Sequence, residues 1–192
     1  MLLTTTLDVA ALISLMPAAI LPFRRPPVRD ALFWSLLVVA VAGPVVCVLA
    51  MFAPGWRTGL APALWITIAA SLFVFGVLSA LMREVWRLAP LLLPYMMLLA
   101  AVATLWIDQP GRPMVDQAPT VWVQFHILIS VVTYGLLTIG AISGFAVVLQ
   151  ERALKRKKPG GFVRMLPSVA DGEQIQVSLL ATGGTVLACG LR

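Results

Sequence analysis

Long apolar stretches, most of them about twenty residues in length, recur along the whole chain and are separated by short polar segments. A helix of about 20 residues spans the roughly 30 Å of hydrocarbon in a bilayer. Only 11% of the residues are charged and 60% are hydrophobic, whereas soluble domains have about 25% charged and roughly 45–50% apolar residues. A chain this poor in charge cannot cover a water-facing surface, so we expect an all-α, polytopic transmembrane helix bundle.

Six stretches are predicted to be spans of a single integral-membrane domain, and they comprise residues 2–21, 31–53, 61–82, 88–107, 121–149 and 175–191. Pro90 and Pro94 are expected to kink the first turns of the fourth span. A basic cytoplasmic segment, 151–176, precedes the last span, and its part 162–176 is expected to form a helix at the membrane interface. Because the last stretch is short and ends at Arg192 without a flank, we expect a C-terminally incomplete chain that continues through a further span.

The basic residues lie mainly in alternate connections. Eleven Lys and Arg side chains are found in residues 23–30, 83–87 and 151–164, whereas the connections on the other side hold Arg57 and Arg112. The positive-inside rule therefore predicts that the three basic connections are cytoplasmic and that the N-terminus is extracytoplasmic. The six tryptophans lie near predicted span boundaries, as in an aromatic belt. No aromatic or motif pattern supports nucleic-acid binding.

Few side chains in this sequence could carry out a reaction. The chain has no phosphate-binding glycine loop, no HExxH metal motif and no GxSxG nucleophile motif. Asp8 is the only acidic residue within a predicted span, and Cys47 and Cys189 lie in separate spans without a CxxC pair. We therefore expect that the protein is not an enzyme.

The single histidine, His126, lies four residues after Trp122 and so about 6 Å below the outer interface on a helix. Polar residues recur there every four positions and form one stripe of the predicted fifth span: His126, Ser130, Tyr134 and Thr138. Intramembrane ionisable residues usually face a bundle interior or a cavity. We therefore expect this stripe to face protein or a cavity rather than lipid.

Two roles remain open for this stripe from the residues alone. Its side chains could make interhelical hydrogen bonds, each contributing roughly 0.6–2 kcal/mol. Alternatively, a neutral imidazole is a good axial ligand to haem iron when an apolar cleft surrounds it. Further along the same span, Gly140 and Gly144 form a GxxxG pair that permits close helix contact.

The stretch from Trp122 to Lys158, WVQFHILISVVTYGLLTIGAISGFAVVLQERALKRKK, resembles the cytochrome c assembly family of CcsA/CcmC-like membrane proteins. It is most similar to the HemX/YpjD-like inner-membrane branch. The matching elements are a tryptophan before His126, then Ser130 and Tyr134, a helix of small residues and a basic LQERALKRK end. Residues 166–191 also look like the stretch that leads into the next span of that family. The resemblance covers roughly the last third of the chain, and the first four spans match only in hydropathy and in their N-out topology.

This resemblance implies a multi-pass protein of the bacterial inner membrane that acts in cytochrome c biogenesis and binds or presents haem near the outer face. His126 would be the axial ligand to the haem iron, the one metal implied, and Trp122, Ser130 and Tyr134 would line the cleft. The partners implied are the lipid bilayer, haem, apocytochrome c and other maturation proteins. Haem-handling members carry a WWD segment and a second histidine, which are absent from these 192 residues and would lie beyond Arg192.

The alternative function is that of a membrane accessory or transport-related protein, with a structural His126 and no haem. A transporter of this size should show paired interrupted helices and symmetry between its halves. In this sequence we find one such interruption, at Pro90 and Pro94, and no repeat.

Overall fold

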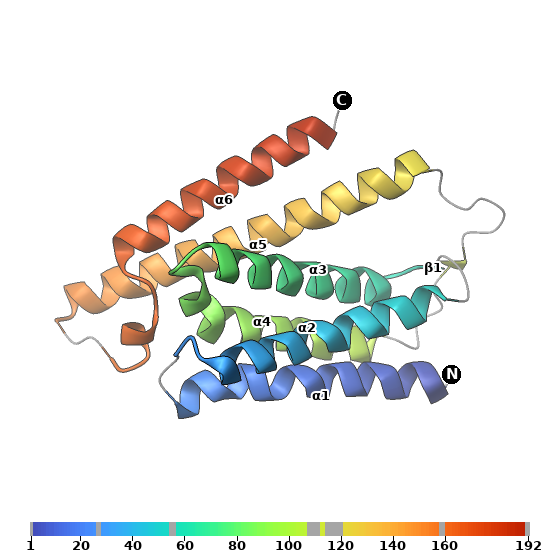
Figure 1. Cartoon of the computed structure of the whole chain (residues 1–192), viewed down its shortest axis with the longest axis horizontal. Helices are drawn as coiled ribbons and strands as arrows, with labels where there is room; N and C mark the ends of the chain where they lie inside the picture. Colours follow the sequence, from blue (N-terminus) through green and yellow to red (C-terminus); the bar gives the residue numbers. More distant parts are fainter. Residues whose placement is uncertain are drawn as a thin grey trace.

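The computed structural model of the chain is an elongated bundle of antiparallel helices (Figure 1). It describes residues 2–25, 28–53, 57–106, 112–113, 121–157 and 160–190. The α-helices in these residues are α1 (Leu2–Arg24), α2 (Ala31–Phe52), α3 (Leu60–Leu81), α4 (Ala89–Leu105), α5 (Val121–Lys155) and α6 (Val169–Gly190). Two short 3-10 helices, η1 (Val85–Leu88) and η2 (Val163–Met165), lie in the connections. The expectation of an all-α bundle is therefore confirmed.

Five helical stretches in the described residues are long and apolar enough to cross a membrane: Thr6–Arg24, Ala31–Phe52, Leu60–Leu81, Val85–Leu105 and Val121–Lys155. Large apolar side chains such as Leu49, Phe73 and Leu98 point outward from the bundle and are exposed. An outward-facing apolar surface on helices of this length is suited to lipid rather than water. The chain is a multi-pass membrane protein.

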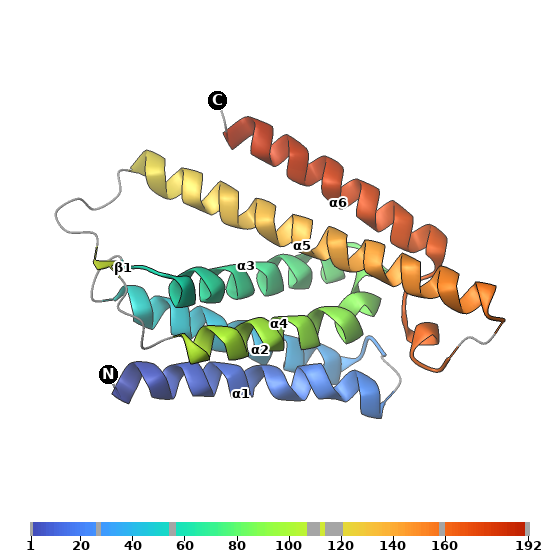
Figure 2. The ribbon, with the colours of Figure 1, turned by 180° about the vertical axis from the view of Figure 1, so that it is seen from behind.

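Most of the largest buried side chains of the core lie in α1, α3 and α4, and the core extends to α5 and α6. Trp65 and Phe75 of α3 and Leu92 and Met96 of α4 are completely buried there. Helix α3 is central, because it packs against α2, α4 and α5. Helix α6 packs chiefly on α5 and stands apart from the first four helices in both views (Figures 1 and 2).

One tryptophan near a helix end faces protein rather than the outside of the bundle. Trp65, in the second turn of α3, is completely buried in the core, and its indole Nε1 has no hydrogen-bond partner among the described residues. Trp34, Trp86, Trp106 and Trp122 are at least partly exposed near helix ends, as expected, and Trp56 lies outside the described residues. The closeness of Trp65 to a span boundary therefore did not predict that its ring would face the core.

The two ends of the bundle differ in charge and in local structure. The three basic connections lie together at one end, which we call the basic end (Figure 1). At the opposite end, β1 (Arg57–Thr58) and β2 (Arg112–Pro113) pair antiparallel, with Arg57 opposite Pro113. The short ladder joins the α2–α3 and α4–α5 connections, a contact that the sequence did not indicate.

The segment after α5 differs from the prediction in two respects. Helix α5 continues through the first basic residues to Lys155, and α6 begins at Val169, six residues before the predicted span. Ser168 explains this start, because its Oγ accepts a hydrogen bond from the Asp171 amide at 3.2 Å and its hydroxyl bonds the Asp171 carboxylate. Such a side chain satisfies a free N–H group in the first turn of a helix. The expected interfacial helix over 162–176 is thus wrong, because residues from 169 onward belong to α6.

Candidate functional site

His126 lies in the second turn of α5, near the end opposite the basic end. The helix runs without interruption from Val121 to Lys155, so the predicted polar residues His126, Ser130, Tyr134 and Thr138 do share one face. The hydroxyls of this face bond within α5. Ser130 Oγ donates to the His126 carbonyl and Thr138 Oγ1 to the Tyr134 carbonyl, each at 2.8 Å. The interhelical hydrogen bonds considered for these two hydroxyls are therefore not formed in the described chain.

The stripe faces outward, contrary to expectation. His126 is exposed, and Trp122 and Tyr134 are 69% and 60% exposed. The stripe points outward because the opposite face of α5 packs on α3. Gly135, nine residues and thus half a turn from His126, lies against Ser71, whose Cα would be 3.4 Å from a Cβ at this glycine. The described helices consequently build no cleft around Trp122, Ser130 and Tyr134.

The imidazole of His126 makes no hydrogen bond or ion pair with another described residue. Both of its ring nitrogens are therefore free of protein partners in this part of the chain. Among the described residues, no group of three or more His, Cys, Asp and Glu side chains is placed to hold a metal ion. Any iron ligated here would depend on His126 as a single nitrogen donor from this face of α5.

The basic-end half of α5 packs closely on α6, as the GxxxG pair predicts. A Cβ on Gly140 would lie 3.7 Å from Leu179 Cβ, and one on Gly144 would lie 3.0 Å from Gln176 Nε2. Small residues at such positions let two backbones approach. The expected close contact through Gly140 and Gly144 is confirmed, and α6 is the partner helix.

Two further residues, Ser143 and Gly172, contribute to this seam, the contact between α5 and α6, and the sequence analysis missed both. Ser143 Oγ donates a buried hydrogen bond of 2.8 Å to the Gly172 carbonyl of α6. A Cβ on Gly172 would lie only 2.6 Å from Val147 Cγ2, so a side chain there requires the Val147 side chain or one of the two helices to shift. The four-residue spacing of Gly140 and Gly144 was a signal for the α5 side of this contact, whereas Gly172 stands in a polar segment without such a pattern.

Asp8 lies within a span and is completely buried. Cys47 Sγ of α2 donates a hydrogen bond of 2.9 Å to its Oδ1, and its Oδ2 has no hydrogen-bond partner among the described residues. Sequence analysis treated the two residues separately, because they are 39 positions apart. The pair connects α1 to α2 through one of the few polar contacts inside the membrane.

Replacing Asp8 should therefore loosen the α1–α2 contact. We expect Asp8→Ala to lower the free energy of unfolding by about 1–3 kcal/mol, because the bond is lost and a cavity remains. Asp8→Asn keeps an oxygen for Cys47 and nearly the same volume, so it should cost at most about 1 kcal/mol. Unfolding in mixed detergent micelles, followed by circular dichroism, would measure both. An Asp8→Ala protein as stable as wild type would mean that this bond does not join the helices.

Comparison with known proteins places the chain among its relatives. No family model matches it, and no solved structure is similar to it. A protein of Azospirillum brasilense, named "Uncharacterized 28.8 kDa protein in nifR3-like 5'region", is 45% identical over 189 residues. The similarity extends over 96% of this chain and 70% of that protein. The chain therefore belongs to the same family as the 28.8 kDa protein of Azospirillum brasilense.

Proposed function

We propose that the protein acts in cytochrome c biogenesis in the bacterial inner membrane and binds or presents haem near the outer face, with His126 as an axial ligand to the iron. The supporting observation is the position of His126 on an exposed face of α5, at the end opposite the basic end. By the positive-inside rule this end lies on the extracytoplasmic side, where cytochrome c is assembled. The resemblance of residues 122–158 to the cytochrome c assembly family suggests that the ligand of His126 is haem.

The described residues around His126 offer a haem one exposed face and do not enclose it. Its imidazole has no protein partner in the described chain, so a ring nitrogen is available to iron. Trp122 lies one turn away on the same helix and is largely exposed, which gives an aromatic surface beside the ligand. The Ser130 hydroxyl donates its hydrogen bond to the His126 backbone carbonyl and not to the imidazole nitrogens. When bound, the haem would supply a redox-active iron, and His126 would hold one of its axial positions.

Haem titration of the purified chain in mild detergent tests this function. We expect a saturable change in the Soret band that ends at one haem per chain, with a spectrum typical of nitrogen ligation. Detergent alone at the same concentration serves as the control for unspecific partition of haem. A titration that rises linearly, as it does in detergent alone, would contradict the proposal.

The alternative, a transport-related protein, draws support from the buried Asp8, because intramembrane carboxylates often mark ion or proton pathways. The continuity of the helices argues against a transporter. α1, α2 and α4 contain prolines in their interior but remain continuous in the described residues, whereas transporter sites are typically built from broken helices. We therefore favour haem handling.

A further inference from the structure

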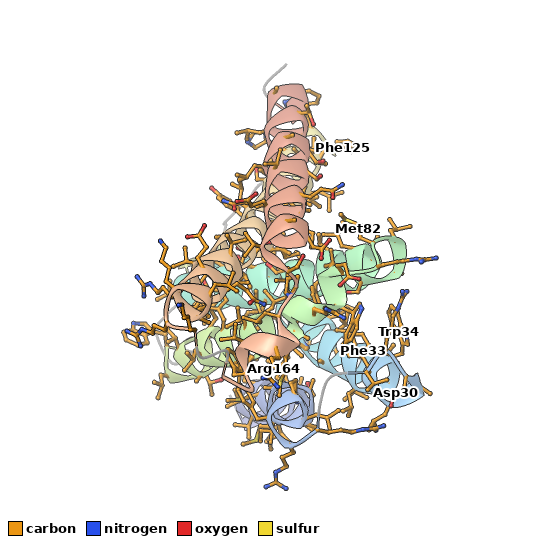
Figure 3. The ribbon with its side chains drawn as sticks, turned by 90° about the vertical axis from the view of Figure 1, so that its left-hand side faces the viewer. Asp30, Phe33, Trp34, Met82, Phe125 and Arg164 are labelled. Carbon is orange, nitrogen blue, oxygen red and sulfur yellow. The ribbon has the colours of Figure 1, made fainter. Side chains whose placement is uncertain are left out.

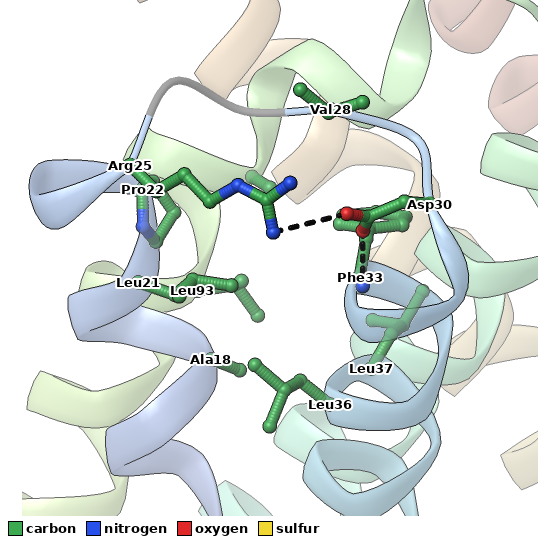
Figure 4. Close-up of a pocket in the computed structure, with 11 residues that line it drawn as sticks. Ala18, Leu21, Pro22, Arg25, Val28, Asp30, Phe33, Leu36, Leu37 and Leu93 are labelled. Carbon is green, nitrogen blue, oxygen red and sulfur yellow. Dashed lines mark hydrogen bonds and ion pairs between the residues drawn. The ribbon is translucent and has the colours of Figure 1, made fainter.

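A cleft lies at the basic end of the bundle, between α1, α2 and α4 (Figure 4). Its walls are apolar, and the space between them, open mouth included, is about 470 Å³. The wall residues are Ala18 and Leu21 of α1, Leu36 and Leu37 of α2, and Leu93 of α4. Ala18 lies six residues before the end of α1, so the cleft reaches about 9 Å from the helix ends into the hydrocarbon. The apolar side chains along its walls would contact hydrocarbon more favourably than water.

The mouth of the cleft is polar. Arg25 reaches across it, and its Nη1 lies 3.2 Å from Asp30 Oδ2 (Figure 4). Both side chains are partly exposed, at 52% for Arg25 and 32% for Asp30. The other carboxylate oxygen of Asp30 accepts a hydrogen bond of 2.9 Å from the Phe33 amide and caps α2. Asp30 would therefore keep its bond to the Phe33 amide if Arg25 turned from it toward another anion.

Positive charge is in excess around this mouth. Arg24 and Arg29 belong to the same connection, residues 23–30, and neither forms an ion pair in the described chain, where the pairs found are Arg25–Asp30 and Arg87–Glu84. Arg29 is held in place, because its guanidinium carbon lies 5.4 Å from the centre of the Trp34 ring and its Nη2 donates to the Ala80 carbonyl at 3.3 Å. Residues 23–30, which hold Arg25 and Asp30 of the mouth, contain three arginines and one acid and so carry a net charge of +2 at this end of the bundle.

Aromatic rings mark the level of this mouth in the membrane. Phe33, which lines the cleft, packs edge-on against Trp34 at 5.5 Å and Trp86 at 6.1 Å between ring centres. Figure 3 shows Asp30, Phe33 and Trp34 together at this end, near Met82. Tryptophans of membrane proteins gather at the headgroup level. The charged mouth therefore lies where lipid phosphates lie, and the apolar walls lie where acyl chains lie.

We propose that this cleft binds one anionic phospholipid of the cytoplasmic leaflet. An acyl chain lies between α1 and α2 against Leu21, Leu36 and Leu93, and the phosphate takes the place of Asp30 as the partner of Arg25. A free phosphate would use the arginines but leave the apolar walls bare, and a neutral lipid would leave the excess charge unpaired. The cytoplasmic leaflet is the one that carries anionic lipids.

Native mass spectrometry of the purified chain in mild detergent, titrated with phosphatidylglycerol or phosphatidylcholine of equal chain length, tests this site. We expect wild type to bind the first phosphatidylglycerol about tenfold more tightly than phosphatidylcholine. Arg25→Gln should weaken phosphatidylglycerol binding by about fivefold and leave phosphatidylcholine unchanged. The matched control is Arg152→Gln, which removes the same charge from α5 at the same end, and it should change either affinity less than about twofold.

Two further arms separate the lipid from its parts. Leu36→Trp fills the cleft without a change in charge, so it should weaken binding of both lipids. Glycerol 3-phosphate at millimolar concentration carries the headgroup charge without acyl chains and should not displace phosphatidylglycerol. Equal affinity for the two lipids, equal loss in the two arginine variants, displacement by glycerol phosphate, or an unaffected Leu36→Trp protein would each overturn the proposal.

Discussion

His126→Ala is expected to lower the haem bound per chain by at least about tenfold, because the variant loses the one imidazole in these 192 residues. The side chain is exposed and makes no hydrogen bond to another described residue, so its removal should leave the bundle intact. The measurement is the Soret absorbance per chain after haem titration, together with the yield of membrane-inserted protein.

Two controls show whether the loss comes from the ligand itself. Tyr134→Phe removes a hydroxyl from the same exposed face, about two helical turns from His126. Because that hydroxyl is not the proposed iron ligand, the variant should keep its haem content within about twofold. Free imidazole added to His126→Ala should restore part of the absorbance, because it replaces the missing axial nitrogen. If wild type and His126→Ala carry equal haem, His126 is not the ligand. The proposed function would then need another donor.

Gly172→Leu is expected to destabilise the contact between α5 and α6 by about 1–3 kcal/mol, and by more if the helices cannot separate. Even the first carbon of the new side chain would lie 2.6 Å from Val147 Cγ2. The movement needed to relieve this clash would also stretch the hydrogen bond from Ser143 to the Gly172 carbonyl. Thermal unfolding in detergent, followed by circular dichroism, would report the change.

Gly184→Leu is the matched control for this variant. It lies on the same helix, gains the same helix propensity and would meet no other atom within 4 Å of its Cβ. We expect its unfolding temperature to equal or exceed that of wild type. If both leucine variants lose the same stability, the seam between α5 and α6 does not depend on the close approach at Gly172.

The lengths of the apolar stretches were enough to predict α2 and α3 to within one or two residues at each end. The start of α6 was missed, because residues 169–176 are polar and hydropathy does not register the cap that Ser168 and Asp171 form. Helical spacing predicted correctly that His126, Ser130 and Tyr134 share a face. It could not tell which face α3 covers, since that depends on the contact of Gly135 with Ser71. The bond from Cys47 to Asp8 was equally out of reach, because it arises only when α1 and α2 lie side by side.

The ladder between β1 and β2 constrains the order in which the protein can be assembled. Arg57–Thr58 cannot meet Arg112–Pro113 until both α3 and α4, which lie between them in the chain, have been inserted. During synthesis, residues 57–58 therefore remain unpaired until residues 112–113 have been made. Once the two strands pair, they close a loop around the α3–α4 hairpin. Helix α5 in turn packs on α3, so the face of α5 that points away from the bundle and carries His126 is decided only after α3 is in place.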